Sequence, residues 1–599
     1  MNGKTMDYRR THRCNDLRKK HIDTMVTLSG WVHRRRDHGG LIFIDLRDRF
    51  GLTQLIFDPE ISKDAHEHAS RLRAEWVISI KGKVCARKEG LVNPKLKTGE
   101  IEVEVLELHI LSKAKTPPFS ICDDSTETSE DLRLKYRYLD IRRGNITEKL
   151  KMRHLAMMAT RTFFDREGFL EITTPVLGRS TPEGARDYLV PSRIYPGNFY
   201  ALPQSPQLFK QLLMAGGIDR YFQIAPCFRD EDLRSDRQPE FTQIDVEMSF
   251  GYPEDIQLLI HEYLKFLFKT CLDYTVPDSI PTMTYHHCLE HYGTDRPDLR
   301  FEMPLVRIDE IAKESNFSVF KEQIESGGCV KALCIKGGAD ASRKEIEKYT
   351  EFVGKFALRG LAWMKRQEEG LSSNIVKFFS LEQQKALEEK LGAETGDLLL
   401  FAAASENLVN QALDHLRRLI GRERNLINPN IYKFLWVTDF PCFEWDKDEN
   451  RPQAVHHPFT MPHPDDLDLL KTDPLKVRSF AYDIIVNGYE LGGGSQRIHD
   501  FDVQKKVFET LQLDANEVKN KFGFFVEALQ YGTPPHLGIA LGLDRLIMLL
   551  SKTENIRDVI AFPKTQKASD LMMHCPSSVS QKQLDELEIK ADAKEITWI

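Results

Sequence analysis

The chain has 599 residues, of which 41% are apolar and 29% are charged, and its formal net charge is −7. This length is too great for one core and suggests roughly four domains, while the negative charge excludes a protein that coats nucleic acid along its whole length. No apolar segment follows the basic start and no run approaches ~18 apolar residues, so we expect neither a secreted nor a membrane-spanning protein.

The ten cysteines are scattered, and the closest pair is Cys329 and Cys334. Without a Cys-x-x-Cys pair, the sequence predicts neither a zinc ribbon nor a disulfide framework. Reduced cysteines are typical of the cytosol, so we expect a cytoplasmic protein that binds no zinc.

Short strand patterns occupy the start of the chain. They lie at 26–32, 41–47, 53–57, 76–84 and 100–110, with a helical piece near 59–74. In the last strand Ile101 and Val103 alternate with Glu102 and Glu104, which indicates one buried and one wet face. The pattern predicts a small barrel of the OB type, a fold that often reads single-stranded nucleic acid.

Basic, aromatic and amide side chains gather in the first hairpin of this barrel. Arg34, Arg36 and His38 fall in the predicted turn, and Phe43 and Gln54 follow on strands. An aromatic ring for base stacking beside guanidinium and amide groups suits RNA loop recognition, whereas a solvated turn and a core phenylalanine would give the same pattern. The candidate RNA-contacting residues are Arg34, Arg36, His38, Phe43, Gln54 and Asn93.

Residues 113–148 change composition. Pro117 and Pro118 precede a polar stretch, and residues 133–143 are rich in arginine and tyrosine. We interpret this segment as a linker with one basic helix, which could act as a hinge and contact an RNA backbone.

A helix is predicted from residue 146, with Leu155 and Met158 at helical spacing and Gly168 as its stop signal. A strand at 169–173 then runs into Pro175. Helix, strand and proline together resemble motif 1 of the class II aminoacyl-tRNA synthetases, which forms the dimer interface in that family. The resemblance implies a homodimer.

Two loops follow. Residues 181–188 contain glycine and proline around Glu183, while Ser205, Gln207 and Lys210 lie at a helix start, where anions are stabilised. Glu183, Gln207 and Lys210 match aspartate-binding positions of bacterial-type aspartyl-tRNA synthetases. The resemblance therefore assigns these residues to the amino-acid substrate.

Two apolar patterns at 221–228 and 241–248 flank a polar loop, which predicts an antiparallel hairpin. Gln243, Asp245 and Glu247 alternate with apolar residues on its second strand, and polar groups on one sheet face are costly unless a polar ligand lies there. A solvated surface hairpin is the alternative. The peptide Phe228-Arg229-Asp230-Glu231 resembles motif 2 of class II synthetases, in which the arginine binds the ATP α-phosphate.

Residues 295–425 have no catalytic spacing. Charged helical stretches such as 344–356 and 381–391 alternate with short strands such as 330–335. The pattern predicts an α/β insertion domain, and it resembles the insertion of the bacterial-type aspartyl enzymes.

Residues that could take part in catalysis or ligand binding appear again after residue 432. Adjacent histidines seldom serve one metal site, so we prefer a substrate-contacting loop for His456 and His457 over a metal site or buried structural histidines. Asp483 and Glu490 flank an apolar strand and, beside ATP, would suit octahedral Mg²⁺. A run of glycines then leads to Arg497.

The peptide Gly538-Ile-Ala-Leu-Gly-Leu-Asp-Arg545 resembles motif 3 of class II enzymes. Small residues would let adenine approach the strand backbone, and Gly542 would open a helix that places Arg545 near phosphate. Helix–strand packing alone would also explain these glycines.

The three motifs occur in order behind a small barrel, the context that such motifs require. The resemblance to the bacterial-type aspartyl-tRNA synthetases runs from Gly30 to Arg545, and neither the signature peptides of the other synthetase class nor a Walker loop is present. It implies a multidomain α+β fold with an N-terminal OB-fold β-barrel and a class II antiparallel-sheet catalytic domain that carries an α/β insertion. The expected domains are the anticodon-binding OB fold (1–112), the linker (113–148), the first catalytic segment with motifs 1 and 2 (149–294), the insertion (295–425), the second catalytic segment with motif 3 (426–566) and a C-terminal extension (567–599).

The implied activity is an aspartate–tRNA ligase. L-Aspartate and ATP would form aspartyl-adenylate by in-line attack on the α-phosphorus, and the aspartyl group would then pass to the 3′ end of tRNA(Asp). Such a reaction needs positioning and charge neutralisation rather than a protein nucleophile. The resemblance assigns catalytic roles to Arg229, Glu490 and Arg545, and Mg²⁺ to Asp483 and Glu490.

The resemblance also implies substrate contacts. For aspartate they are Glu183, Ser205, Gln207, Lys210, Arg229, Asp245, His456 and Arg497. For ATP they are Arg229, Asp230, Glu231, Gln238, Glu490, Gly542, Leu543, Asp544 and Arg545, and the barrel residues named above would contact the anticodon. Lys210 and Arg497 are expected to pair with the substrate side-chain carboxylate, so that asparagine would leave two buried cations unpaired.

One barrel residue bears on the choice of tRNA. A leucine in the first hairpin accompanies family members restricted to tRNA(Asp), whereas His38 resembles the relaxed form that also aspartylates tRNA(Asn). Two alternatives stay open: a synthetase for asparagine or lysine, and a non-catalytic RNA-binding paralogue. The presence of Arg229, Glu490 and Arg545 together argues against the paralogue.

Overall fold

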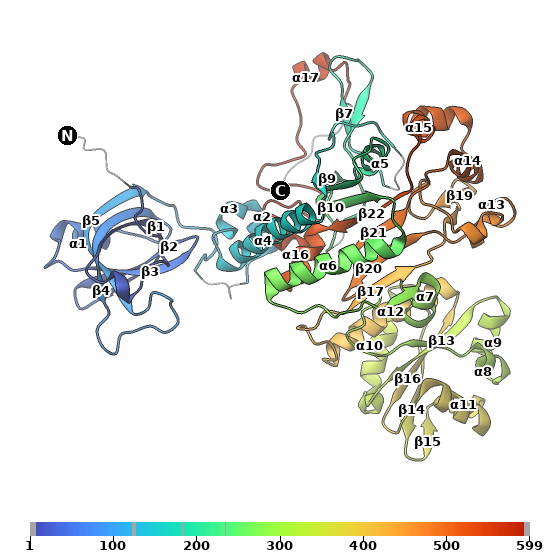
Figure 1. The fold of residues 1–599 in the computed structure, drawn as a ribbon. Helices are drawn as coiled ribbons and strands as arrows, with labels where there is room; N and C mark the ends of the chain where they lie inside the picture. The colour runs from blue at the N-terminus through green and yellow to red at the C-terminus, as the bar shows by residue number, and fades with distance from the viewer. Residues whose placement is uncertain (1–7, 123–126, 182–184, 234, 592–599) are drawn as a thin grey trace. The chain divides into compact units, whose positions relative to one another are not determined.

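The computed structural model describes residues 8–122, 127–181, 185–233 and 235–591 (Figure 1). Its contacts divide the chain into two compact units. Of the described residues, the first unit contains those up to Lys151 together with Arg557–Ser577, and the second contains Met152–Ile556 together with those from Ser578 to 591.

The first unit contains a closed barrel with the strand order β1-β2-β3-β5-β4. Ile101 and Val103 are buried while Glu102 and Glu104 are half-buried, as their alternation predicts. The OB-type barrel is thereby confirmed. Its elements are β1 (Met25–His38), β2 (Leu41–Asp48), β3 (Gly51–Phe57), α1 (Lys63–Ser70), β4 (Val77–Ala86) and β5 (Ile101–Ser112).

The first hairpin differs from the prediction in one respect. Strand β1 continues to His38, so Arg34, Arg36 and His38 lie on a strand and not in a turn. Gly39 and Gly40 make the turn with φ of +59° and +83°, a conformation that is accessible to glycine at little cost. Because alternate residues of a strand share a face, the three basic residues project from the same side of β1.

The predicted linker forms two short helices, α2 (Glu130–Lys135) and α3 (Arg137–Asp140), which precede the long helix α4 (Gly144–Arg166). Arg137 is buried, and its guanidinium donates hydrogen bonds to the backbone carbonyls of Arg557, Ile560 and Ala561. This arginine of the basic linker therefore holds the 557–561 segment and is not exposed for an RNA backbone.

The second unit is built on an eight-stranded sheet within the described residues, with the order β11-β17-β20-β21-β22-β10-β9-β6 (Figure 1). Its inner pairs are antiparallel, whereas the two edge pairs, β11 with β17 and β6 with β9, are parallel. The strands are β6 (Leu170–Glu171), β9 (Arg220–Phe228), β10 (Glu240–Ser249), β11 (Thr282–Thr284), β17 (Phe434–Thr438), β20 (Ala481–Val486), β21 (Tyr489–Gln496) and β22 (His536–Gly542). The predicted hairpin at 221–248 is β9 and β10.

The two faces of this sheet have opposite chemistry. On one face, Phe222 of β9 stacks on Phe164 of α4 at 5.2 Å between ring centroids, and Phe164 lies 5.2 Å from Tyr263 of α6 (Pro253–Leu272). The other face carries Gln243, Asp245 and other polar residues. An apolar layer of helices thus supports a sheet whose opposite face is polar.

Further helices and strands precede and follow the sheet strands. They are β7 (Leu189–Pro191), β8 (Phe199–Ala201), α5 (Gln207–Ala215), α7 (Tyr285–Tyr292), β18 (Phe443–Asp446), β19 (Arg451–Ala454), α13 (Leu469–Thr472), α14 (Phe501–Thr510), α15 (Ala515–Leu529), α16 (Leu543–Leu550) and α17 (Gln581–Glu586).

A second sheet, with the order β12-β13-β16-β14-β15, lies within the chain segment predicted to be an α/β insertion. Its central strand β16 is apolar throughout, because one core with α10 and α12 covers one face and another core with α8, α9 and α11 covers the other. The elements are β12 (Leu305–Arg307), α8 (Asp309–Glu314), α9 (Ser318–Glu325), β13 (Cys329–Ile335), α10 (Arg343–Gly354), β14 (Ala362–Gln367), β15 (Gly370–Ser372), α11 (Leu381–Leu391), β16 (Leu398–Ala404) and α12 (Glu406–Glu423).

Across the residues described, no helix combines the length and the apolar character that crossing a lipid bilayer requires.

Candidate active site

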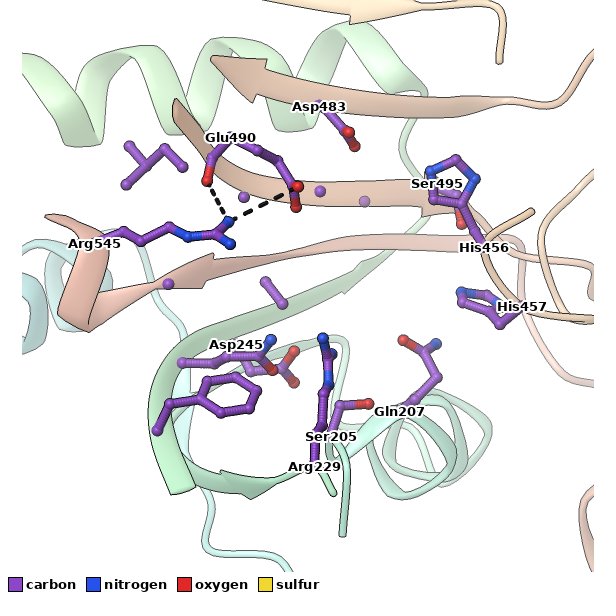
Figure 2. A pocket seen from close by; sticks show the side chains of 18 of the residues that line it. Ser205, Gln207, Arg229, Asp245, His456, His457, Asp483, Glu490, Ser495 and Arg545 are labelled. Carbon is purple, nitrogen blue, oxygen red and sulfur yellow. Dashed lines mark hydrogen bonds and ion pairs between the residues drawn. The ribbon is translucent and has the colours of Figure 1, made fainter. Parts of the chain in front are cut away.

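A cavity of about 440 Å³ lies over the polar face of the large sheet. Figure 2 shows Arg545 reaching toward Glu490, with Asp483 beyond, while Arg229, Ser205 and Gln207 stand across from them. The predicted site residues that line this cavity are Ser205, Gln207, Lys210, Arg229, Glu231, Gln238, Asp245, His456, Asp483, Glu490, Arg497, Gly542, Asp544 and Arg545.

Four charged side chains form one buried cluster beneath the cavity. Lys210 Nζ lies 2.6 Å from Asp245 Oδ1 and 3.3 Å from Glu247 Oε2, and Arg497 donates through Nε and Nη2 to Glu247 at 2.9 and 3.1 Å. We call Lys210, Asp245, Glu247 and Arg497 the charge cluster. All four side chains are at most 2% exposed, a degree of burial that charged groups tolerate only when paired.

The charge cluster alters the expected picture of Lys210 and Arg497. The sequence suggests two cations that await a substrate carboxylate, but each already has a carboxylate partner from β10. The cluster is formally neutral, because two cations face two anions. A ligand carboxylate must therefore share these cations with Asp245 and Glu247.

The two carboxyls of the cluster titrate in opposite directions. Burial raises the pKa of Asp245 despite the attraction of Lys210. Burial also works to raise the pKa of Glu247, but Arg497 and Lys210 outweigh it and the pKa is lowered. Glu247 is thus the firmly ionised partner of Arg497.

The two adjacent histidines are held neutral. Burial, followed by the charge of Arg497, lowers the pKa of His456 to about 4 and that of His457 well below its ordinary value. His457 Nε2 lies 2.9 Å from Arg497 Nη1, so His457 accepts a hydrogen bond from the charge cluster. His456 lines the cavity directly.

Arg229 lies at the end of β9 with its backbone N–H donating to the Pro239 carbonyl at 2.9 Å. Its side chain packs over the ring of Phe241, 5.1 Å from the ring centroid. This contact orients the planar guanidinium along the cavity wall, a position from which it can donate two hydrogen bonds to one anion.

Arg545 occupies the first turn of α16, after Gly542 at the helix N-cap. Nη1 donates to the Glu490 carbonyl at 2.8 Å, and Nη2 lies 3.3 Å from Asp236 Oδ2. Glu231 in the same hairpin loop pairs with Arg237 at 3.0 Å. The hairpin loop and α16 thus meet at one end of the cavity.

Asp483 and Glu490 face the cavity from β20 and β21. Burial, then the charges of Glu490 and Asp295, raises the pKa of Asp483 well above its ordinary value. A buried carboxyl at Asp483 beside the half-buried Glu490 fits a hard cation such as Mg²⁺, whose remaining ligands would be phosphates and waters. The described residues contain no group of three or more His, Cys, Asp or Glu that could hold a metal ion by themselves.

Some of the polar atoms that line this cavity are buried and unpaired. In the described part of the chain, four of its lining atoms are buried without a hydrogen-bond partner: the donors Gln207 Nε2 and Arg229 Nε and the acceptors Asp245 Oδ2 and Asp483 Oδ1. Buried polar atoms are normally paired. The arrangement therefore fits a ligand that carries both negative and positive groups.

Gly538 of the motif 3 peptide lies against the charge cluster. A Cβ at Gly538 would lie 1.8 Å from Glu247 Oε2, so a larger residue would clash with this carboxylate. Glycine here permits the register in which Gly538 lies opposite Glu247.

Two predicted site residues of α16 differ in their surroundings. Leu543 is fully buried and is not among the residues that line the cavity. Asp544 lines the cavity and also accepts hydrogen bonds from Arg153 and from the Thr242 backbone at 2.5 and 2.8 Å, which ties α16 to α4 and β10. Asp230 is outside the cavity lining and lies 3.8 Å from Arg186. Glu183 lies outside the described residues.

The barrel residues belong to the first unit. Arg34, Arg36 and His38 are exposed, and Phe43, Gln54 and Asn93 are half-buried. Arg36 Nη2 donates to Asp45 at 2.8 Å and to Gln54 at 3.2 Å. These contacts join β1, β2 and β3 into one polar surface of the barrel.

Sequence reasoning missed several lining residues. Asp295 and Tyr285 precede the inserted sheet, and Ser495 Oγ accepts a hydrogen bond from Arg497 Nη1 at 2.6 Å. Asp295 stands at the first residue of the predicted insertion, where nothing in the local pattern distinguishes it from a surface aspartate.

Two family models match the chain. Residues 129–566 match "tRNA synthetases class II (D, K and N)", and residues 26–111 match "OB-fold nucleic acid binding domain".

Curated relatives match over nearly the whole length. The chain is 63% identical over 598 residues to the aspartate–tRNA(Asp/Asn) ligase of Protochlamydia amoebophila, covering 100% of each, and 56% identical over 581 residues to the same ligase of Chlamydia caviae, covering 97% of this chain and 99% of the relative.

Among solved structures, asparaginyl-tRNA synthetase from Pyrococcus horikoshii in complex with asparaginyl-adenylate has a TM-score of 0.58 at 18% identity, covering 92% of this chain and 98% of that one. A putative aspartyl-tRNA synthetase from Leishmania major has a TM-score of 0.57 at 19% identity, covering 94% and 96%. At these identities the likeness establishes the fold.

Proposed function

The chain belongs to the aspartate–tRNA ligases among the class II tRNA synthetases, and we propose that its cavity joins L-aspartate to ATP and passes the aspartyl group to both tRNA(Asp) and tRNA(Asn). The observation that carries the chemical assignment is the buried charge cluster beneath a cavity with unpaired donors and acceptors. Aspartate offers a matching set of two carboxylates and one ammonium group.

The amino acid lies over the charge cluster in this proposal. Its ammonium group meets Asp245, whose Oδ2 is without a partner among the described residues, and Gln207 and Ser205 contact it from the start of α5. Its side-chain carboxylate shares Lys210 and Arg497 with their protein partners. Asparagine would place a neutral amide against these cations, so the lost charge disfavours it.

The nucleotide lies between the hairpin and α16. Arg229 neutralises charge on the α-phosphate while the aspartate α-carboxylate oxygen bonds to phosphorus and the bond to the leaving pyrophosphate breaks. Arg545 binds the outer phosphates, and Glu231 and Gln238 contact the base. Neither step requires a covalent bond to the protein.

We assign Mg²⁺ to Asp483 and Glu490. The cation would supply charge neutralisation at the phosphates. The raised pKa of Asp483 and its unpaired Oδ1 support this assignment, because both indicate a carboxylate that lacks a positive partner among the described residues.

The polar barrel surface is the proposed anticodon contact. Arg34, Arg36 and His38 on β1 provide positive charge and hydrogen-bond donors, and Phe43 provides a ring for stacking. His38 is exposed at the end of β1, beside a glycine turn that adds no side chain. This open position supports an anticodon-binding surface that does not discriminate between the two tRNAs.

We also propose a homodimer in the cytoplasm. Leu155 and Met158 on α4 are 40% and 48% exposed, and Leu170 and Leu177 are 54% and 53% exposed, so large apolar side chains gather on the motif 1 segment. Sedimentation equilibrium should give twice the 69.1 kDa of one chain. Leu170→Glu should give the mass of one chain, whereas a monomeric parent protein would refute the dimer.

Pyrophosphate exchange tests the function. The purified chain should exchange labelled pyrophosphate into ATP in the presence of L-aspartate, and not with L-asparagine or L-lysine. Exchange driven by either of the latter would overturn the substrate assignment. Purified tRNA(Asp) and tRNA(Asn) should both accept aspartate, and a failure to charge tRNA(Asn) would refute the relaxed specificity.

A further inference from the structure

We propose that helix α12 of the insertion positions the active site through the loop at residues 293–303, and that Arg417 is the positioning residue. The inference rests on the proposed function, since it concerns the adenylation step. It gives a role to an insertion whose sequence shows no chemistry.

Arg417 is fully buried and serves the loop backbone. Its Nε donates to the Met303 carbonyl at 2.9 Å, and Nη2 donates to the carbonyls of Asp298 and Phe301, each at 2.9 Å. The guanidinium also stacks on the Phe301 ring, 4.2 Å from its centroid. Burying a guanidinium is costly, so these contacts fix the path of the loop.

Other residues of α12 lie directly against the same loop. A Cβ at Gly293, where φ is +71°, would lie 2.4 Å from the Asn410 carbonyl oxygen. A Cβ at Gly421 would lie 2.8 Å from the Phe301 ring. Helix α12 therefore lies close to the loop at Gly293, the first residue of the loop, and again at Phe301, eight positions later.

The loop meets the cavity at Asp295 and the turn between β20 and β21 at Asp298. Asp295 lines the cavity. Asp298 is buried, and its carboxylate accepts hydrogen bonds from the backbone and guanidinium of Arg300 at 2.6 to 3.2 Å. It also packs against Gly488, where an added Cβ would lie 3.1 Å from the Cβ of Asp298.

Gly488 makes the turn that joins β20 to β21, with φ of +81°. The two strands carry Asp483 and Glu490, and their register shifts between Ile484 and Ile485, on the strand that leads into the turn. Asn487, with φ of +54°, is the other residue of this two-residue turn, and Asp298 packs against the turn at Gly488. Asp298 thus links the insertion to the spacing of the two carboxylates, and small displacements of catalytic groups are costly to rate.

The test compares three variants of the full chain. Arg417→Met removes the donors and keeps the bulk, and Arg417→Lys keeps the charge without the planar fork. Arg424→Met is the matched control, because Arg424 follows the same helix but pairs with Asp340 and Glu345 inside the insertion.

Hydrogen exchange gives a readout that needs no catalysis. In Arg417→Met, peptides covering 293–303 and 483–492 should exchange faster than in the parent chain, while those covering 329–335 and 398–404, within the insertion sheet, should be unchanged. Arg424→Met should leave the first two regions protected.

Pyrophosphate exchange gives the second readout. Arg417→Met should lower kcat by about tenfold to a hundredfold and raise the KM for ATP, while the KM for aspartate stays near that of the parent chain. Arg417→Lys should change kcat and the KM for ATP in the same direction but by less. If Arg417→Met does not fold, the comparison is made with Arg417→Lys.

The inference is overturned if a folded Arg417 variant retains parental protection at 483–492, if its KM values for ATP and aspartate rise together, or if the Arg424→Met control shows the same changes. An inactive parent chain would instead refute the proposed function, and the hydrogen-exchange comparison would still decide whether α12 controls the turn.

Discussion

Arg497 holds Glu247 by two hydrogen bonds, Nε to Oε1 at 2.9 Å and Nη2 to Oε2 at 3.1 Å, with both side chains at most 2% exposed. A fork of this geometry fixes the plane of both groups. The third nitrogen, Nη1, is left to face His457 and Ser495. The direction in which Arg497 can meet a substrate is therefore set by β10.

Replacing Glu247 by Gln should destabilise the second unit. The amide keeps the shape of the side chain but leaves the charge of Arg497 buried without its strongest partner, at a cost of about 3–5 kcal/mol in the free energy of unfolding. Calorimetry should show a lowered Tm. Glu262→Gln, which removes an exposed pair with Lys265, should shift stability by less than about 0.5 kcal/mol, and equal effects of the two changes would contradict the prediction.

Arg229→Lys should lower the rate of adenylate formation by about 10²–10³, because one ammonium group cannot replace a planar donor aimed at the α-phosphate. The loss should fall mainly on kcat in pyrophosphate exchange. Arg451→Lys, at a half-buried arginine that pairs with Glu449 outside the cavity lining, is the control and should retain parental rates. Similar kinetics for the two variants would remove Arg229 from the catalytic set.

Glu290 should contribute to stability in a pH-dependent way. Hydrogen bonds from Arg307 lower the pKa of this carboxyl from 4.5 to about 2. A lowered folded-state pKa stabilises the protein fully above the unfolded pKa, and the contribution is lost as the pH falls from about 4.5 toward about 2. The Tm difference between parent and Glu290→Gln should therefore be largest at neutral pH and shrink over that range. Exposed Glu347→Gln should show no such trend, and a difference independent of pH would be the contrary result.

His38→Leu should restrict the choice of tRNA. If the exposed ring on β1 permits the relaxed reading, the variant should aspartylate tRNA(Asn) several-fold less efficiently while keeping tRNA(Asp), since discrimination at one base is worth about 1–3 kcal/mol. Aminoacylation kinetics with each purified tRNA give the ratio. His109→Leu on β5 provides an exposed-histidine control, and an unchanged ratio in His38→Leu would remove this residue from tRNA selection.

The sequence predicted what local patterns encode. Alternation at Ile101 and Val103 identified the barrel, and the polar alternation from Gln243 marked the cavity face of β10. The pairing of Arg497 with Glu247 joins residues 250 positions apart. The registers of β10 against β22 and of β21 against β22 bring them together, and no local pattern specifies these registers.

The errors have the same physical origin. Arg34 to His38 read as a turn because charged residues precede two glycines, but the cross-strand partners on β2 extend β1 to the turn itself. Asp295 escaped notice because it lines the cavity from a loop that packs against α12, more than a hundred residues later in the chain. Tertiary contacts decide both cases.

The charge cluster also limits how specificity can change. Its members come from α5, β10 and the residue that follows β21, and each cation is matched by a carboxylate. A variant enzyme for a neutral amino acid could not simply lose Lys210 or Arg497, because the orphaned Asp245 or Glu247 would then oppose folding. Substrate choice in this scaffold should therefore change by exchanging cation and anion as a pair, and single substitutions should yield unstable proteins before they yield new specificities.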